Sequence, residues 1–84
     1  MKFKALVFIR LRSSVDDSAG NAVKGACTRL SKIKISKLRL GKCIDIDFEA
    51  ESRDQANDEI KSLCKKFLAN EVIEDWSYEL EKVK

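Results

Sequence analysis

The stretch LRLGKCIDIDFEA, residues 38–50, decides how this sequence is expected to fold. Its even-numbered positions, Lys42 excepted, are apolar, whereas most of its odd-numbered positions are charged. Because side chains alternate between the two faces of a strand, this unbroken alternation predicts one long strand. A two-residue hairpin at Gly41 and Lys42 would move the leucines before it onto the face of the aspartates after it. A three-residue loop starting at Gly41 would keep the alternation but place its glycine at an unusual position.

A strand of this length is too long for one compact chain of 84 residues. Residues 38–50 at about 3.3 Å each extend over roughly 43 Å, whereas a compact globule of this chain length is about 30 Å across. The simplest second sheet for the excess length belongs to an identical chain related by a two-fold axis. The sequence therefore predicts a homodimer or a dimer of dimers.

One further strand and one helix are expected before this strand, and another strand and helix after it. Residues 2–11 and the segment from Val72 onward alternate as strands, and a capping-box spacing begins a helix at Ser52. Apolar residues at helical spacing form one stripe of Ala19, Ala22, Val23, Ala26, Cys27, Leu30 and Ile33 and another of Ala56, Ile60, Leu63, Cys64, Phe67 and Leu68.

The resulting order predicts an α+β fold over a single domain, residues 1–84. It is β-α-β-α-β, with two helices on one face of an antiparallel sheet and a long middle strand. A β-α-β-β-α-β ferredoxin-like arrangement is the alternative.

Charge is divided unequally between the two halves of the chain. Residues 1–42 carry 11 basic and 2 acidic side chains, a balance of +9, and residues 43–84 carry 6 basic and 12 acidic, a balance of −6. Such halves suit packing on each other, within a chain or between chains, or a nucleic-acid patch on the basic half. The N-terminus does not resemble a signal peptide and no apolar run could span a membrane, so a cytoplasmic protein is expected.

The residue types needed for catalysis or cofactor binding are scarce. The chain has no histidine, three cysteines without a CxxC pair, and three glycines that form no phosphate-binding motif. We therefore expect no catalytic, cofactor-binding or metal-binding residues, and buried free thiols instead of disulfides.

The sequence resembles the PurS family, the small subunit of phosphoribosylformylglycinamidine (FGAM) synthase, over nearly its full length. The resemblance is clearest where residues 67–76, FLANEVIEDW, and Glu79 match a family run of Leu-Leu-Ala-Asn-x-Val-Ile-Glu followed by an aromatic residue and a later Glu. The segments RLGK at 39–42, CKK at 64–66 and AV at 22–23 also fit. The chain departs from the family at residues 17–20, DSAG, where Asp-Pro-x-Gly is common, and at Trp76, which replaces a usual Tyr or Phe.

This resemblance implies a dimer that shares its long middle strand and exchanges its C-terminal helix and strand between chains. It also implies an accessory subunit of a C–N ligase that takes its nitrogen from glutamine in purine biosynthesis. The large subunit, PurL, would convert FGAR, ATP and ammonia to FGAM, ADP and phosphate. PurQ would release that ammonia from glutamine. The complex would use ATP and Mg, with no cofactor on this subunit, which would bridge PurL and PurQ for ammonia transfer.

Six residues are candidates for contact with partner subunits, and each also has a purely structural explanation. Asn70 suits a left-handed helix terminus, Gly41 a bend or bulge, and Trp76 a dimer core. The charged candidates suit solvated positions, cross-strand pairs or edge protection. The complete set is Arg39, Gly41, Lys42, Asn70, Glu74 and Trp76.

Two other classes of protein remain as alternatives. A small RNA-binding α+β module would use the basic half, but it needs stacking aromatics on its central strands, where Asp45, Asp47 and Glu49 are expected. A metal or ligand sensor of ferredoxin-like build would need histidines, a CxxC pair or a ligand loop. The expected partners are therefore proteins, without nucleic acid or membrane.

Overall fold

The computed structural model describes residues 1–84 and confirms the predicted order of strands and helices. In chain order the elements are β1 (Lys2–Leu11), α1 (Ser18–Leu30), β2 (Gly41–Glu49), α2 (Arg53–Leu63), the π-helical turn η1 (Cys64–Leu68) and β3 (Glu74–Val83). The fold is α+β. The ferredoxin-like alternative is wrong, because the sheet has three strands and β2 leads into a helix, not a fourth strand.

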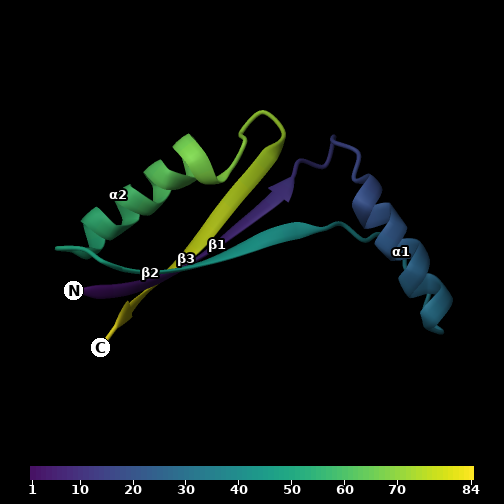
Figure 1. The fold of residues 1–84 in the computed structure, drawn as a ribbon, viewed down its shortest axis with the longest axis horizontal. Helices are drawn as coiled ribbons and strands as arrows, with labels where there is room; N and C mark the ends of the chain where they lie inside the picture. Colours follow the sequence, from purple (N-terminus) through teal and green to yellow (C-terminus); the bar gives the residue numbers. More distant parts are fainter.

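The strands form one antiparallel sheet in the order β2-β1-β3, with β1 in the middle (Figure 1). Phe3 lies opposite Phe48 of β2, and Ile9 lies opposite Trp76 of β3. Odd-numbered positions of β1 therefore share a face with even-numbered positions of β2 and β3. The alternation predicted for the middle strand is confirmed along β2.

The middle strand is shorter in the sheet than the sequence predicted. No hairpin interrupts β2, but its pairing ends where Gly41 lies opposite Arg10, and residues 38–40 have no strand partner in this chain. The physical reason is that β1 finishes at Leu11, so the segment before Gly41 has no neighbouring strand to pair with. The edge of residues 38–40 is left open.

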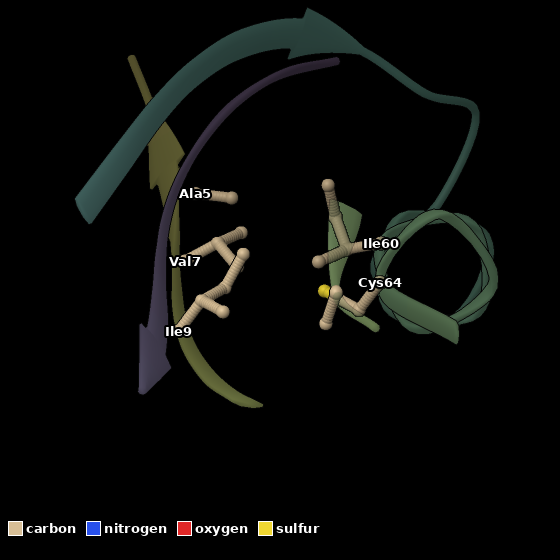
Figure 2. Packing of buried hydrophobic residues seen from close by; sticks show 6 residues of the cluster. Ala5, Val7, Ile9, Ile60 and Cys64 are labelled. Atoms are coloured by element: carbon tan, nitrogen blue, oxygen red, sulfur yellow. The ribbon is translucent and has the colours of Figure 1, made fainter. Parts of the chain in front are cut away.

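Helix α2 covers one face of the sheet because the topology requires a crossover there. β2 and β3 both run antiparallel to β1, so they are parallel to each other and their connection must return along the sheet. Figure 2 shows the side chains of β1 facing those of α2 and η1. The buried cluster consists of Ala5, Val7, Ile9, Ile60, Cys64 and Ala69.

The start of α2 confirms the cap predicted at Ser52. Its Oγ accepts a hydrogen bond from the backbone N–H of Gln55 at 3.1 Å. The Gln55 side chain accepts a hydrogen bond from the N–H of Glu51 at 2.6 Å, one residue before the cap. Both bonds satisfy backbone donors at the helix entry.

Helix α1 does not lie over the sheet of its own chain, which differs from the expectation of two helices on one face (Figure 1). β1 and β2 are antiparallel neighbours, so the connection that contains α1 starts and ends at the same end of the sheet. Nothing in the topology obliges α1 to cross the sheet face. Its apolar stripe is left uncovered, with Leu30 87% exposed.

The projecting helix gives the chain an extended shape. The radius of gyration is 16.5 Å and the principal extents are 50 × 30 × 14 Å, whereas a compact chain of this length has a radius near 12 Å. Only 10 of the 84 residues are buried. No helix is long and apolar enough to cross a lipid bilayer.

Candidate interface at one end of the sheet

The six candidate interface residues lie around the end of the sheet where β1 finishes. Positions 9 and 10 of β1 pair with positions 42 and 41 of β2, and positions 9 and 11 pair with positions 76 and 74 of β3. Hydrogen bonds tie Asn70 and Arg39 to the same region. We call this group the sheet-end cluster; with two residues added by the structure, its members are Arg39, Gly41, Lys42, Asn70, Glu74, Trp76, Arg12 and Asp17.

Glu74 and Asn70 fix the loop that enters β3. The Glu74 carboxylate accepts a hydrogen bond from the Asn70 N–H at 2.8 Å and lies 3.8 Å from the Lys42 ammonium. The Asn70 side chain accepts from the N–H of Val72 at 3.1 Å, and its carbonyl accepts from the N–H of Ile73 and Glu74. No residue has a positive φ, so the interpretation of Asn70 as a left-handed helix terminus is wrong. Its side chain stabilises a turn instead.

Arg39 and Asp17 join the segment that leaves β1 to the segment that enters β2, on either side of α1. The Arg39 guanidinium donates to the carbonyls of Val15 at 2.6 Å and Arg12 at 3.1 Å. The buried Asp17 carboxylate accepts from the N–H of Leu40 at 2.9 Å and of Gly20 at 2.8 Å. These two backbone N–H bonds, with a smaller contribution from the Arg39 charge, lower the pKa of Asp17 despite its burial.

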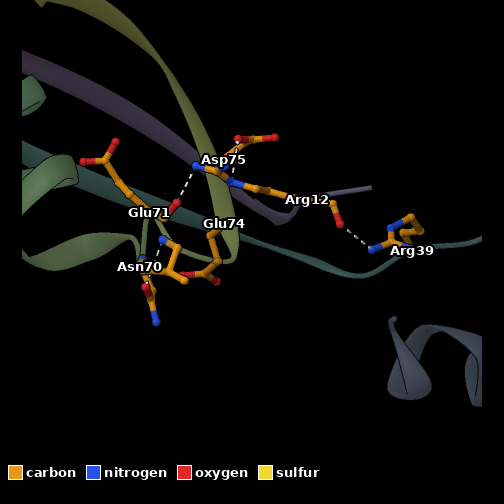
Figure 3. A network of polar contacts seen from close by, with 7 residues as sticks. Arg12, Arg39, Asn70, Glu71, Glu74 and Asp75 are labelled. Carbon is orange, nitrogen blue, oxygen red and sulfur yellow. Dashed lines mark hydrogen bonds and ion pairs between the residues drawn. The ribbon is translucent and has the colours of Figure 1, made fainter. Parts of the chain in front are cut away.

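Arg12 is a member of the cluster that sequence reasoning missed. Its guanidinium donates to the carbonyl of Glu71, and its Nε lies 3.5 Å from the Asp75 carboxylate (Figure 3). Its own carbonyl accepts the bond from Arg39. The only sequence signal was a basic residue directly after the first strand, which is too common to single out.

Gly41 is required by a close approach of two backbones, not by a turn. A Cβ at this position would lie 2.9 Å from the carbonyl oxygen of Ile9 and 3.1 Å from Cγ of Arg10.

Trp76 is half-buried on the core side of the sheet, stacked on Tyr78 with ring centroids 6.3 Å apart. The Tyr78 hydroxyl donates to Asn57 of α2 at 3.0 Å. Gly41 and Trp76 both serve the internal packing of the chain.

The sheet face opposite α2 is acidic in its flanking strands. Leu6 of β1 lies between Asp45 and Glu79, and Lys4 lies between Asp47 and Glu81. A face with two acidic rows repels a phosphate backbone. This arrangement disfavours the RNA-binding alternative.

The three cysteines are free thiols, but the expectation that they are buried is wrong for two of them, since only Cys64 is buried while Cys27 is half-buried and Cys43 is exposed. Burial raises the pKa of the Cys64 thiol, so it remains protonated in the core. No group of three or more His, Cys, Asp or Glu side chains is placed to hold a metal ion.

Comparisons with known proteins agree on one family. The PurS family, described as phosphoribosylformylglycinamidine (FGAM) synthase, matches residues 4–82. The PurS subunit of Bacillus subtilis is 37% identical over 81 residues, covering 96% of this chain and 95% of the relative. A solved structure of Thermus thermophilus PurS superposes on this chain with a TM-score of 0.90 at 29% identity, over the whole of both chains.

A structure of the PurLQS complex from Thermotoga maritima contains a similar chain. It matches with a TM-score of 0.89 at 30% identity and covers 96% of this chain and 99% of the other. The family match extends over nearly the whole length of this sequence, and the relatives are matched over nearly their whole length as well. This chain belongs to the PurS family of phosphoribosylformylglycinamidine synthase subunits.

Proposed function

We propose that this chain is the accessory PurS subunit of FGAM synthase and holds the large ATP-dependent subunit and the glutaminase together. The observation that carries the proposal is the fold match to the chain in the PurLQS complex over 96% of this chain. The reaction is the conversion of FGAR, ATP and glutamine to FGAM, ADP, phosphate and glutamate. Its place is the cytoplasm, where purine biosynthesis occurs.

The polar groups of the sheet-end cluster support a structural role. Arg12 and Arg39 bind backbone carbonyls, and Asn70 and Glu74 bind backbone N–H groups. These side chains are engaged in holding loops, which leaves them poorly placed to donate or accept protons in a reaction. ATP and Mg would therefore be bound by the large subunit, and ammonia would be supplied by the glutaminase.

The active form is a homodimer, or a dimer of dimers, with the second copy covering the surfaces left open in one chain. The apolar stripe of α1 is uncovered, with Ile33 just beyond it 66% exposed, and residues 38–40 offer an unpaired strand edge. A second copy would provide both a sheet for α1 and a strand for residues 38–40. In this structure α2 and β3 pack on β1 of their own chain, and their exchange between copies is part of the proposal.

The candidate residues would present this end of the sheet to partner subunits. The Lys42 side chain is 65% exposed although it lies near Glu74. Arg39, Asn70 and Glu74 would keep the neighbouring loops in one conformation. A preorganised loop binds with a smaller loss of conformational entropy.

Co-purification tests this function directly. A tagged form of this chain, mixed with the large subunit and the glutaminase of the same organism, should recover both in one peak on size-exclusion chromatography with light scattering. Asn70→Gly/Glu74→Gln, which loosens the 70–74 loop, should weaken recovery. Asp54→Asn, a change on the first turn of α2, serves as the control. Failure of the unmodified chain to recover either partner would contradict the proposal.

A further inference from the structure

A basic depression lies at the sheet-end cluster and shares Arg39 and Gly41 with it, whereas its other two cations, Arg10 and Lys37, have no role in the fold or in the proposed function. Its volume is about 420 Å³. It is lined by residues from the end of β1, the loop after it and the segment that enters β2: Arg10, Leu11, Ser13, Lys37, Arg39 and Gly41. The lining thus holds three cations and one hydroxyl, and no carboxylate.

None of the three cations forms an ion pair with an acidic side chain of this chain, and only Arg39 interacts at longer range with one, the Asp17 carboxylate. The two ion pairs in the structure join Arg12 to Asp75 and Lys42 to Glu74. Asp75 lies opposite Arg10 in the sheet register, but its carboxylate is the one near Arg12 Nε, at 3.5 Å. Asp75 and Glu74 are therefore engaged outside the depression, which leaves Arg10 and Lys37 without an acidic partner.

One of the cations, Arg39, is held in place by backbone carbonyls, and a second, Arg10, lies close to the backbone of Gly41. One nitrogen of the Arg39 guanidinium donates to the carbonyls of Val15 and Arg12, and Figure 3 shows the contact with Arg12. This anchoring uses Nη2 and leaves Nη1 and Nε without a protein acceptor. Because Gly41 has no side chain, it leaves space for the Arg10 side chain; a Cβ at position 41 would lie 3.1 Å from Arg10 Cγ.

We propose that this depression binds a phosphate group, either free orthophosphate or the phosphate of a monoester. Guanidinium groups match phosphate oxygens with paired N–H donors, and the Lys37 ammonium adds a mobile third charge. A phosphate carries about −1.5 to −2 charges at neutral pH, so it neutralises three cations better than a single carboxylate does. The volume is larger than one phosphate requires, which leaves room for the organic part of an ester.

The test is a titration of the whole protein, followed by the amide chemical shifts of residues 10–13 and 37–41 in NMR spectra. The probes are inorganic phosphate, ribose 5-phosphate and acetate, each at constant ionic strength. Both phosphates should saturate in the millimolar range or tighter, with acetate at least tenfold weaker. A monoester that binds at least threefold more tightly than orthophosphate identifies the ester as the ligand class, and equal affinities identify the free ion.

A charge-matched pair of variants separates a site from general electrostatic attraction. Arg10→Gln/Lys37→Gln removes two charges from the depression, and both side chains are exposed, so the fold should persist. Lys2→Gln/Lys82→Gln removes two exposed charges at the opposite end of the sheet. The first variant should bind phosphate at least tenfold more weakly, and the second should bind within twofold of the unmodified protein.

Three results would overturn the phosphate site: shifts that never saturate, equal losses in both variants, or acetate binding as tight as phosphate. Single-stranded RNA that binds more tightly than the monoester would point to a nucleic-acid surface instead. These measurements use the purified subunit without its partners. They can therefore fail while co-purification succeeds, and the reverse is equally possible.

Discussion

Replacing Ile60 by alanine truncates the largest fully buried side chain of α2. Ile60 is 1% exposed and belongs to the cluster with Val7, Ile9 and Cys64. It lies in the helix that makes the only crossover of the sheet. Ile60→Ala therefore tests whether α2 is held by burial of this side chain or by its connections alone.

The magnitude follows from the atoms removed. Three carbons leave the core, at about 0.8 kcal/mol each, or roughly 2.4 kcal/mol of lost transfer free energy. The incompletely filled space adds a cavity contribution of about 1 to 2 kcal/mol, which gives a total of about 3.5 to 4.5 kcal/mol. Stabilities of about 0.05 to 0.15 kcal/mol per residue are usual, so this loss is a large part of the total for a chain this small.

Urea unfolding followed by far-ultraviolet circular dichroism measures this difference in the free energy of unfolding. The protein concentration must be equal for all variants, because an obligate dimer unfolds with a concentration-dependent midpoint. Leu63→Ala is the matched control on the same helix, since Leu63 is 43% exposed, and it should cost less than about 1.5 kcal/mol. Equal losses for the two variants would refute the assignment of Ile60 to the core.

Three more outcomes are expected. Leu30→Asp on the uncovered stripe of α1 should shift the dimer toward monomer in light scattering at micromolar concentration, whereas Asn21→Asp on the polar side should not; a dimer unchanged by Leu30→Asp would exclude α1 from the interface. The pKa of Asp17 is lower in the folded than in the unfolded protein, so its charge stabilises the fold above about pH 4, and this contribution is lost as the pH falls through the folded pKa. The difference in the free energy of unfolding between the unmodified protein and Asp17→Asn should therefore shrink in acid. A difference that grew in acid would mean that the charged carboxylate destabilises the fold. Asn70→Gly and Asn70→Ala should each cost about 0.5 to 1.5 kcal/mol in urea unfolding through the lost turn bond, and stabilisation by glycine would restore the left-handed interpretation.

The strands and the covering helix could be predicted because their signals are local. The alternation through Ile44, Ile46 and Phe48 determines a strand face, and Ile60 and Cys64 lie at helical spacing on the side that packs. The β-α-β-α-β order follows from these patterns alone. The family resemblance was confirmed as well, because it rested on several motifs at consistent separations.

The position of α1 could not be predicted, because an apolar stripe shows which side of a helix packs but not on what. Val23 and Leu30 form a normal amphipathic pattern and yet have no cover in this chain. The loop contacts were also out of reach. Arg39 and Arg12 bind backbone carbonyls brought near by the sheet register, and such contacts leave no pattern in the sequence.

The same limit explains why Asn70 was misassigned. Asn at the end of a helix favours a left-handed terminus in general. Here the π-helical turn η1 ends in extended backbone at Ala69, and the Asn70 side chain accepts from Val72 instead. The choice between the two depends on the path into β3, which the helix sequence does not encode.

The central claim is that this chain brings the glutaminase and the ligase together without performing chemistry. The most direct measurement is FGAM formation by the large subunit and the glutaminase, with glutamine or with ammonium as the nitrogen source, with and without this chain. Docking raises the effective concentration of one active site near another, which matters for transferred ammonia more than for ammonia in bulk. Omitting the chain should abolish most glutamine-dependent turnover and leave ammonium-dependent turnover largely intact. Full glutamine-dependent turnover in its absence would contradict the account.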